Sequence, residues 1–331
     1  MSSLAQRGIR AAGVGVSELS LGCAQLGNLY REVSDDDAGA TVGAAWELGV
    51  RYFDTAPHYG LGLSERRLGA ALANRPRAEY VLSSKVGRVL EPLAAVEGVD
   101  DEGFAVPRTH RRVFDFGREG IRRCFAESLA RLRVDRLDIA YLHDPDDHIP
   151  EVLASGFPAL AELRAEGAVA AIGAGMNHST PLARLVRETD VDVVMLAGRY
   201  TLLDQEALDD LLPACEERGI AVVAAGVFNS GLLARPVPPD DATYDYGRAP
   251  RRLVERARAI AAICRRHGTT LPAAAIAFPL AHPAVVSVCV GARSPEQVER
   301  NVSLYREPIA PDLWRELQAE GLLRADAPMP R

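Results

Sequence analysis

The sequence predicts a single closed (β/α)8 TIM barrel that spans residues 1–331. Eight short runs rich in Val, Ile, Leu and Ala alternate with eight amphipathic segments along the whole chain. Each run is nearly continuous in apolar residues, which is typical of parallel strands that are buried on both faces. The composition does not change between the two halves of the 331 residues, and α/β barrels of this size commonly form one domain.

The predicted strands and helices follow one another in alternation. The strands are expected at Ser20–Ala24, Tyr52–Thr55, Tyr80–Val86, Leu137–Leu142, Val169–Ala174, Val191–Leu196, Ala221–Gly226 and Val285–Val290. The helices are expected at Asp36–Leu48, Ser64–Arg75, Arg118–Leu132, Pro158–Glu166, Pro181–Glu188, Gln205–Arg218, Arg251–His267 and Pro295–Leu304. Capping residues support these boundaries, with Ser64 and Ser294 expected to begin helices. A glycine follows four of the predicted helix ends, at Gly49, Gly167, Gly219 and Gly268.

Two long segments interrupt this alternation. Arg88–Asp115 is an irregular excursion after the third strand, and Ala234–Ala249 follows the seventh. Both follow the carboxyl ends of strands, where barrel enzymes keep their active sites, so we expect lids or binding loops. An extra helix at Pro311–Leu323 is expected to cover part of the barrel. The alternative fold, a doubly wound open sheet, needs a glycine-rich phosphate loop after its first strand, and Gly13-Val14-Gly15 is too early and too short.

Composition and charge exclude several classes of function. The chain has 38 basic and 45 acidic residues, and this net charge of −7 argues against a nucleic-acid-binding surface. No apolar run approaches the roughly 20 residues that cross a bilayer, and the segment 1–15 lacks the features of a secretion signal. The five cysteines are widely spaced and form no CxxC pair, which is typical of reduced thiols. We therefore expect a cytoplasmic protein with a small-molecule substrate and no nucleic-acid or membrane partner.

Four polar residues at the ends of neighbouring predicted strands form the candidate catalytic site. Asp54 ends the second strand, Tyr59 lies in the loop after it, Lys85 ends the third strand and His143 ends the fourth. Lys85 is also the only lysine in the chain. Each residue alone has a structural explanation, such as a turn cap or a buried histidine. Because the strands of a parallel barrel end on one face, the four together indicate an active site there.

The chemistry of these side chains points to the interconversion of a carbonyl and an alcohol. A buried lysine needs a counter-ion, and Asp54 can supply one. A phenol beside the ammonium is expected to have a pKa below its ordinary value of about 10, so that Tyr59 can act as a general acid or base. His143 can orient the substrate oxygen or share the proton. The hydride must come from a cofactor.

A metal-dependent hydrolase is a rival interpretation of the same face. The stretch from His143 to His148 contains residues that bind metals. However, a metal centre needs further ligands on other strands, whose ends offer mostly Gly, Ala and Met. We therefore expect no metal site. No serine or thiol lies beside a suitable base, so acyl transfer is poorly supported.

The sequence resembles the aldo-keto reductase family over nearly its whole length. The motifs that carry the resemblance are Tyr52-Phe53-Asp54-Thr55-Ala56-Pro57-His58-Tyr59-Gly60, Ser64-Glu65-Arg66-Arg67-Leu68-Gly69, Ser84-Lys85 and Leu142-His143. The resemblance implies an NAD(P)-dependent oxidoreductase whose catalytic residues are Asp54, Tyr59, Lys85 and His143, with Tyr59 as the acid/base. Further stretches resemble the branch that includes L-fucose, D-threo-aldose and pyridoxal dehydrogenases, which implies a sugar-like or cyclic polar substrate. These stretches are Leu142–Asp146, Ala197–Asp204 and Phe228–Leu233.

The resemblance also implies where a nicotinamide cofactor binds. The expected cofactor-binding residues are Gly22, Cys23, Asn177, Arg199, Phe228, Asn229, Ser230, Gly231, Gly291, Arg293, Gln297 and Asn301. Some family positions differ in this chain. The Ser-Asn pair after the fifth strand falls on Gly175-Met176, the glutamine of strand six on Ala197 and the aromatic residue of strand seven on Ala225.

The choice between NAD and NADP depends on the groups that face the adenosine ribose. The family's lysine and helix arginine for a 2′-phosphate fall on Gly291 and Gln297 in this chain. Arg293 is then the one candidate cation for that phosphate. A single cation favours NAD narrowly, with NADP as an alternative.

Two other functions are compatible with these features. One is a ketoreductase of a biosynthetic pathway that acts on a sugar-bearing or cyclic ketone. The other is a catalytically silent barrel used as a binding or regulatory subunit, and the complete set of catalytic residues argues against it. The sequence leaves the substrate and the oligomeric state open. Polar residues of the long loops are candidates for hydrogen bonds to a polyol, namely Asp101, Glu102, Arg108, His110 and Tyr244.

Overall fold

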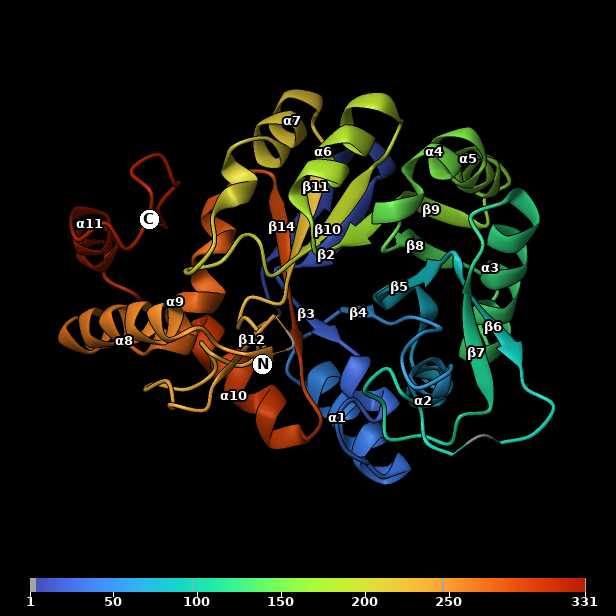
Figure 1. Cartoon of the computed structure of the whole chain (residues 1–331), viewed down its shortest axis with the longest axis horizontal. Coiled ribbons are helices and arrows are strands. Elements are labelled where there is room, and N and C mark those ends of the chain that lie inside the picture. Colours follow the sequence, from blue (N-terminus) through green and yellow to red (C-terminus); the bar gives the residue numbers. More distant parts are fainter. Residues whose placement is uncertain (1–3, 97, 246, 331) are drawn as a thin grey trace.

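The structure is a computed structural model that describes residues 4–96, 98–245 and 247–330. Eight parallel strands form a closed barrel at its centre, which confirms the predicted fold class (Figure 1). In chain order the strands are β3 (Leu19–Gly22), β4 (Tyr52–Asp54), β5 (Val81–Val86), β8 (Leu137–His143), β9 (Val169–Met176), β10 (Val193–Ala197), β11 (Ala221–Ala225) and β14 (Val285–Gly291). Each pairs with the next, and β14 pairs with β3 to close the ring. The predicted strand ends differ from these by at most 2 residues.

Helices surround the barrel in the order that the alternating pattern predicts. They are α1 (Asp35–Glu47), α2 (Leu63–Leu72), α3 (Arg118–Leu132), the short α4 (Ile149–Glu151), α5 (Phe157–Ala165), α6 (Ser179–Glu188), α7 (Leu211–Arg218), α8 (Arg251–Arg266), α9 (Leu271–Ala277), α10 (Pro295–Arg306) and α11 (Pro311–Ala319). The helix expected from Gln205 begins only at Leu211, after a 3-10 turn at Glu206–Leu208. The extra carboxyl-terminal helix is present as α11.

One helix of the barrel wall was not predicted. Helix α9 packs against α10, whereas α8 lies farther out, against α9 and α11 (at the left in Figure 1). The segment Leu271–Ile276 of α9 is buried throughout. A helix that is apolar on every side shows no amphipathic period, so the sequence pattern did not reveal it.

The predicted helix caps are confirmed at one of two serines. The Ser294 side chain accepts a hydrogen bond from the backbone N–H of Gln297, and Pro295 follows it. The prediction for Ser64 is wrong because α2 begins one residue earlier, after Gly62. The buried Ser64 hydroxyl instead donates to the carbonyl of Cys23 at 2.6 Å. The four glycines expected after helix ends all have left-handed backbone conformations, at Gly49, Gly167, Gly219 and Gly268.

Strand β1 (Gln6–Ile9) and strand β2 (Val14–Ser17) form an antiparallel hairpin that was not predicted. Ile9 and Val16 belong to the same buried cluster as the side chains that fill the barrel. That cluster includes the first residues of β5 and β11, Val81 and Ala221. The hairpin therefore covers the end of the barrel where the strands begin, and the open face is the opposite end.

Both long excursions contain strands, so the expectation of an irregular segment is wrong for part of Arg88–Asp115. After β5, strand β6 (Arg88–Pro92) pairs antiparallel with β7 (His110–Phe114). After β11, β12 (Thr243–Tyr244) pairs with β13 (Gly247–Arg248). Strands this short and partly exposed carry a weak sequence signal.

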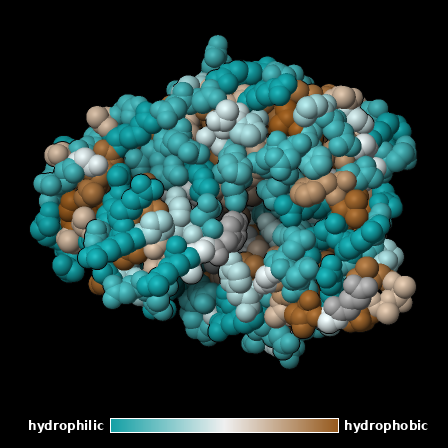
Figure 2. Space-filling model, viewed as in Figure 1, coloured by the Kyte–Doolittle hydropathy of each residue, from teal (hydrophilic) through white to brown (hydrophobic). Residues whose placement is uncertain are grey.

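No described helix combines the length and apolar character that crossing a membrane requires. On the face seen in Figure 2, hydrophilic residues predominate and hydrophobic ones form small separate groups. All five cysteines are buried and free, so the expectation of unpaired thiols is confirmed.

Candidate active site

The open face of the barrel brings the four predicted catalytic residues together. Asp54, Lys85 and His143 lie on the adjacent strands β4, β5 and β8, and Tyr59 lies in the loop between β4 and α2. The Lys85 ammonium is 2.6 Å from Oδ2 of Asp54 and 3.1 Å from the phenol oxygen of Tyr59. The rings of Tyr59 and His143 meet edge to face with centroids 6.0 Å apart.

The hydrogen bonds of Lys85 fix the direction of the bond to Tyr59. An ammonium group has three N–H donors, and those of Lys85 reach Asp54, the carbonyl of Thr55 at 3.1 Å and the Tyr59 oxygen. The phenol oxygen therefore accepts from Lys85. Among the described residues the proton of the phenol has no acceptor, so it remains available to a substrate oxygen.

Burial changes the expected ionisation of Tyr59. Burial raises the pKa of Tyr59, the Lys85 ammonium lowers it and the Asp54 carboxylate raises it again, and the net shift is upward. The prediction of a Tyr59 pKa below its ordinary value is therefore wrong, because the phenolate loses more solvation than the ammonium replaces. Burial also lowers the pKa of Lys85, but Asp54 and Tyr59 outweigh it and leave that pKa raised. At neutral pH the pair is a neutral phenol beside a charged ammonium.

His143 is held in its neutral form. Burial lowers its pKa well below the ordinary value, and the Arg88 guanidinium and Lys85 ammonium lower it further. Its buried Nδ1 has no hydrogen-bond partner within the described part of the chain, and its Nε2 lies 3.6 Å from Oδ2 of Asp144. A neutral imidazole can donate one hydrogen bond and accept another, so His143 can bind a substrate oxygen without adding charge.

Two glycines position the loop that carries Tyr59. A Cβ atom on Gly60 would lie 2.2 Å from the carbonyl oxygen of Gly27, and one on Gly27 would lie 2.6 Å from the carbonyl carbon of Tyr59. Gly60 also has a φ of 62°, which favours glycine. The loop after β4 can therefore lie directly on the 3-10 turn after β3, and any side chain at either position would move Tyr59.

Charged residues surround His143 at the rim of the site. The Arg88 guanidinium donates to Oδ2 of Asp144 at 2.7 Å and lies 3.3 Å from Nδ1 of His58. Glu102 lies 3.7 Å from Arg88 and 3.6 Å from His58. Burial and, to a smaller extent, the Arg88 guanidinium lower the pKa of His58 to about 2, so this ring is also neutral.

The excursion between β6 and β7 is fastened over Tyr59. A buried ion pair joins Arg112 to Asp100 at 2.5 Å, and Asp100 accepts the backbone N–H groups of Glu102 and Phe104. Phe104 lies against the Tyr59 ring with centroids 6.1 Å apart. At its other edge Ala105 exchanges hydrogen bonds with Asn28, at 2.9 Å through the backbone and 3.1 Å through the Asn28 amide.

Of the five loop residues proposed for a polyol, the structure brings Glu102 to this rim. The other four already have partners elsewhere in the described chain. Asp101 pairs with Arg108 at 3.1 Å, His110 meets the Thr109 hydroxyl at 2.8 Å and Tyr244 donates to Asp204 at 3.5 Å.

A cleft of about 620 Å³ opens on the same face of the barrel, where Ala197 and Gly291 end β10 and β14, and the four candidate catalytic residues are not part of its lining. Gly291 in its wall pairs with Gly22 across β14 and β3, and Gly22 pairs with Asp54. Ten of the twelve residues expected to bind a cofactor line this cleft, and they are Asn177, Arg199, Phe228, Asn229, Ser230, Gly231, Gly291, Arg293, Gln297 and Asn301.

The remaining two, Gly22 and Cys23, are not among the lining residues. Cys23 is fully buried, and its backbone N–H donates to the carbonyl of Asp54 at 2.8 Å. These two residues hold β3 against β4 instead, and a cofactor contact for them stays a prediction.

The polar groups of the cleft fit a nicotinamide dinucleotide. Gln25 Oε1 and Asn229 Oδ1 are buried in its wall without hydrogen-bond partners in the described ranges, so they can accept from an amide. Arg293 and Arg300 bring two guanidinium groups, and neither forms an ion pair with a described carboxylate. The amino end of α10 and the cations favour phosphates. Gln25 and Arg300 were not predicted, although Arg300 lies on α10, which begins two residues after Arg293.

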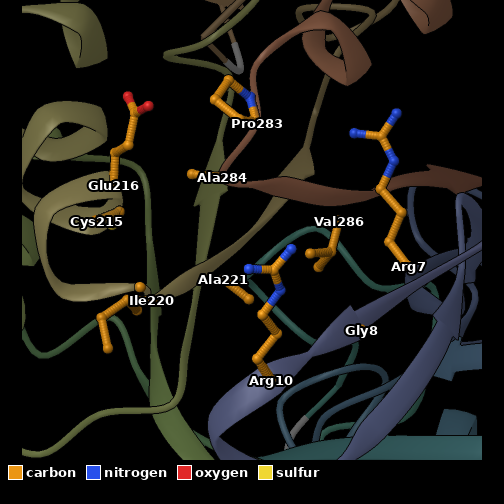
Figure 3. A pocket seen from close by; sticks show the side chains of 11 residues that line it. Arg7, Gly8, Arg10, Cys215, Glu216, Ile220, Ala221, Pro283, Ala284 and Val286 are labelled. Carbon is orange, nitrogen blue, oxygen red and sulfur yellow. The ribbon is translucent and has the colours of Figure 1, made fainter.

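A second cavity, of about 370 Å³, lies beside β1, where β11 and β14 begin (Figure 3). Arg7, Arg10 and Glu216 are its charged side chains, and Arg7 is engaged by Glu18 at 2.6 Å. This end of the barrel is opposite to Tyr59 and Lys85. No cluster of three or more His, Cys, Asp or Glu suited to a metal occurs among the described residues.

The barrel, the four candidate catalytic residues and a cleft that fits a dinucleotide indicate the class of this protein, which is an oxidoreductase. Comparison with known proteins then gives its family. Residues 18–320 match the Aldo/keto reductase family, and the chain belongs to that family. Enzymes of this family use NAD(P)H.

Individual relatives span almost the whole chain. A D-threo-aldose 1-dehydrogenase from Pseudomonas sp is 51% identical over 95% of this chain and 96% of its own. A pyridoxal 4-dehydrogenase from Microbacterium luteolum is 39% identical over 96% of this chain and 98% of its own. A solved aldo-keto reductase from Bacillus halodurans, in its holo form, superimposes with a TM-score of 0.76 at 26% identity, covering 98% of both chains. The resemblance to the family and to its branch of dehydrogenases is confirmed.

Proposed function

We propose that this enzyme interconverts an alcohol and a carbonyl on a sugar-like or cyclic polar substrate, in the manner of an aldose 1-dehydrogenase. The observation that carries the proposal is the row Asp54–Lys85–Tyr59, in which the phenol accepts from Lys85 and keeps its own proton for the substrate. The 51% identity with a D-threo-aldose 1-dehydrogenase supports the substrate class. A bound nicotinamide cofactor supplies or accepts the hydride.

In this mechanism Tyr59 is the general acid and base. It gives its proton to the carbonyl oxygen in reduction and removes the hydroxyl proton in oxidation. Lys85 stabilises the phenolate, Asp54 keeps Lys85 charged and His143 orients the substrate oxygen. Because the pKa of Tyr59 is raised, the phenol is protonated at neutral pH, and oxidation is expected to accelerate as the pH rises.

The charged rim beside His143 supports a polyhydroxylated substrate. The side chains of Asp144 and Glu102 are 34% and 44% exposed, and both lie against Arg88. Carboxylates accept hydrogen bonds from hydroxyl groups, whereas an apolar ketone would leave this rim unsatisfied. Sugars therefore fit the rim better than simple aliphatic ketones.

The cleft supports the use of both NAD and NADP. The narrow preference for NAD rested on Arg293 as a single cation, but Arg300 also lines the cleft. If Arg293 holds the 2′-phosphate, Arg293→Ala should weaken NADP binding by about 1–3 kcal/mol and leave NAD nearly unchanged, because a charge-assisted bond is lost only with NADP.

Calorimetric titration of each cofactor into the wild type, Arg293→Ala and Arg300→Ala measures this difference. Arg300→Ala is the matched control within the cleft, and it shows whether the second guanidinium shares the phosphate. Equal losses of NAD and NADP in Arg293→Ala would mean that this side chain contacts another part of the cofactor.

The substrate is tested with a panel of aldoses, aldehydes and ketones, each offered with NAD(H) and NADP(H) and followed at the nicotinamide absorbance. We expect aldoses to give the highest kcat/KM. A strong preference for a cyclic or sugar-bearing ketone in the reducing direction would favour a biosynthetic ketoreductase. Cofactor binding without turnover of any substrate would indicate a silent binding subunit.

We also propose a cytoplasmic location. The five cysteines are free and buried, which is typical of proteins that fold in a reducing compartment.

A further inference from the structure

A row of buried hydroxyl groups approaches Asp54 from inside the barrel. The Ser83 hydroxyl lies 2.7 Å from Oδ1 of Asp54 and 3.2 Å from the phenol oxygen of Tyr52. The Tyr52 oxygen in turn lies 3.1 Å from that of Tyr141. All four side chains are at most 2% exposed. The mechanism proposed above uses none of these three hydroxyls.

The strand geometry explains why this row exists. Side chains two residues apart on a strand share a face, so each inward residue lies one layer deeper than the one that follows it. Asp54 is level with Ser83 across β4 and β5, and Lys85 is level with Tyr141 across β5 and β8. Three catalytic residues thus each have a hydroxyl residue two positions earlier on the same strand. The pairs are Tyr52 and Asp54, Ser83 and Lys85, and Tyr141 and His143.

Proton counting indicates the direction of the hydrogen bonds. Each hydroxyl has one proton to donate, and an ionised carboxylate can only accept. The geometry places Ser83 as a donor both to Oδ1 of Asp54 and to the Tyr52 oxygen, and it leaves the direction between Tyr52 and Tyr141 open. Because the one Ser83 proton goes to the charged acceptor, we expect Tyr52 to donate to Ser83 and Tyr141 to Tyr52, which directs every dipole toward the carboxylate. Hydrogen bonds aligned in this way strengthen one another in a medium of low polarity.

We propose that Ser83, Tyr52 and Tyr141 are positioning residues that hold the Asp54 carboxylate in its orientation, and through it fix Lys85 against Tyr59. The inference rests on the proposed role of Tyr59. The Ser83 bond fixes the rotation of the Asp54 carboxylate, so that Oδ2 faces Lys85. It also draws negative charge toward Oδ1, away from the phenol.

Other ionisable groups near Asp54 do not compete for this role. Cys23, directly after β3, and Cys289, on β14, face it, and burial raises the pKa of both thiols, so they stay neutral. Burial likewise raises the pKa of Tyr52 and Tyr141, which keeps their protons in place for donation. Asp144 is the further charged group that faces Tyr59, and the substitutions tested below leave it unchanged.

The test combines pH profiles with a double-mutant cycle. In Ser83→Ala, kcat for alcohol oxidation is expected to fall about tenfold, and its alkaline limb should move to higher pH, because a charge-assisted bond to Asp54 is lost. Tyr141→Phe should act in the same direction by a smaller factor. In the Ser83→Ala background, Tyr141→Phe should have no further effect on kcat, because hydrogen bonds no longer connect Tyr141 to Asp54. KM for the cofactor should stay unchanged.

Two substitutions serve as controls for the loss of a buried hydroxyl. Ser84→Ala removes the neighbouring hydroxyl of β5, which donates to Glu65 at 2.7 Å and faces away from Asp54. Tyr200→Phe removes a buried phenol oxygen without a partner among the described residues. Both variants should keep the alkaline limb of kcat for alcohol oxidation at the pH of the wild type.

Two outcomes would overturn the proposal. One is that Ser83→Ala and Tyr141→Phe keep the wild-type kcat and the wild-type position of the alkaline limb. The other is that their effects on kcat simply multiply. An active Tyr59→Phe variant would instead overturn the proposed function, so the two failures can be told apart.

Discussion

Replacement of Tyr59 by phenylalanine is expected to lower kcat by about 10²–10⁴-fold or more in both directions, because the general acid and base is removed. The structure indicates that the fold survives this change. Lys85 keeps its bonds to Asp54 and to the carbonyl of Thr55, and the remaining ring still packs against Phe104. Steady-state kinetics measure the loss, and fluorescence titration of the cofactor checks that the cleft still binds it.

Wild-type turnover in Tyr59→Phe would remove this residue from the mechanism. A loss of cofactor binding together with activity would show that the side chain supports the cleft rather than the chemistry. The variant therefore separates catalysis from structure at the residue on which the proposed function depends.

Replacement of Lys85 by methionine is expected to have the second large effect. The ammonium lowers the pKa of Tyr59 against the effect of burial, so its removal should raise that pKa further. The phenolate of Tyr59 then forms only at higher pH. The alkaline limb of kcat/KM for oxidation should move to higher pH and lose height by about 10²–10⁴-fold. Profiles of the wild type and Lys85→Met over the same pH range measure the shift.

The same change leaves the buried Asp54 carboxylate without its cation, which costs about 3–5 kcal/mol of stability in comparable sites. The double variant Lys85→Met/Asp54→Asn removes both charges and is the control for folding, followed by circular dichroism. We expect the double variant to regain stability but not activity. If Lys85→Met is folded and active and its alkaline limb for oxidation stays at the wild-type pH, then Lys85 does not lower the pKa of Tyr59.

The barrel was predictable because its strands bury both faces and so form continuous apolar runs. The strand from Val169 and the strand from Val285 are examples, since they are buried almost throughout. Two elements were not predicted, because neither shows a clear hydrophobic periodicity. They are the helix Leu271–Ala277 and the hairpin of Gln6–Ile9 with Val14–Ser17.

The positions of the candidate catalytic residues were predictable for a related reason. Asp54, Lys85 and His143 are charged or polar side chains at the ends of apolar strands, and parallel register brings such ends together. The ionisation of Tyr59 was not predictable, because a sequence shows which charges are near but not how deeply the phenol is buried. Ser83 was missed although the alternation of two residues along β5 placed it on the same face as Lys85.

The anchored excursion over the active site has a consequence for exchanging specificity between related barrels. Arg112 and Asp100 both lie within the segment 88–114, so their ion pair would be kept if this segment were grafted onto another barrel. The bonds between Ala105 and Asn28 would not, because Asn28 belongs to the turn after β3. The transferable module is therefore discontinuous, and a chimera must carry both stretches to inherit the donor's choice of substrate.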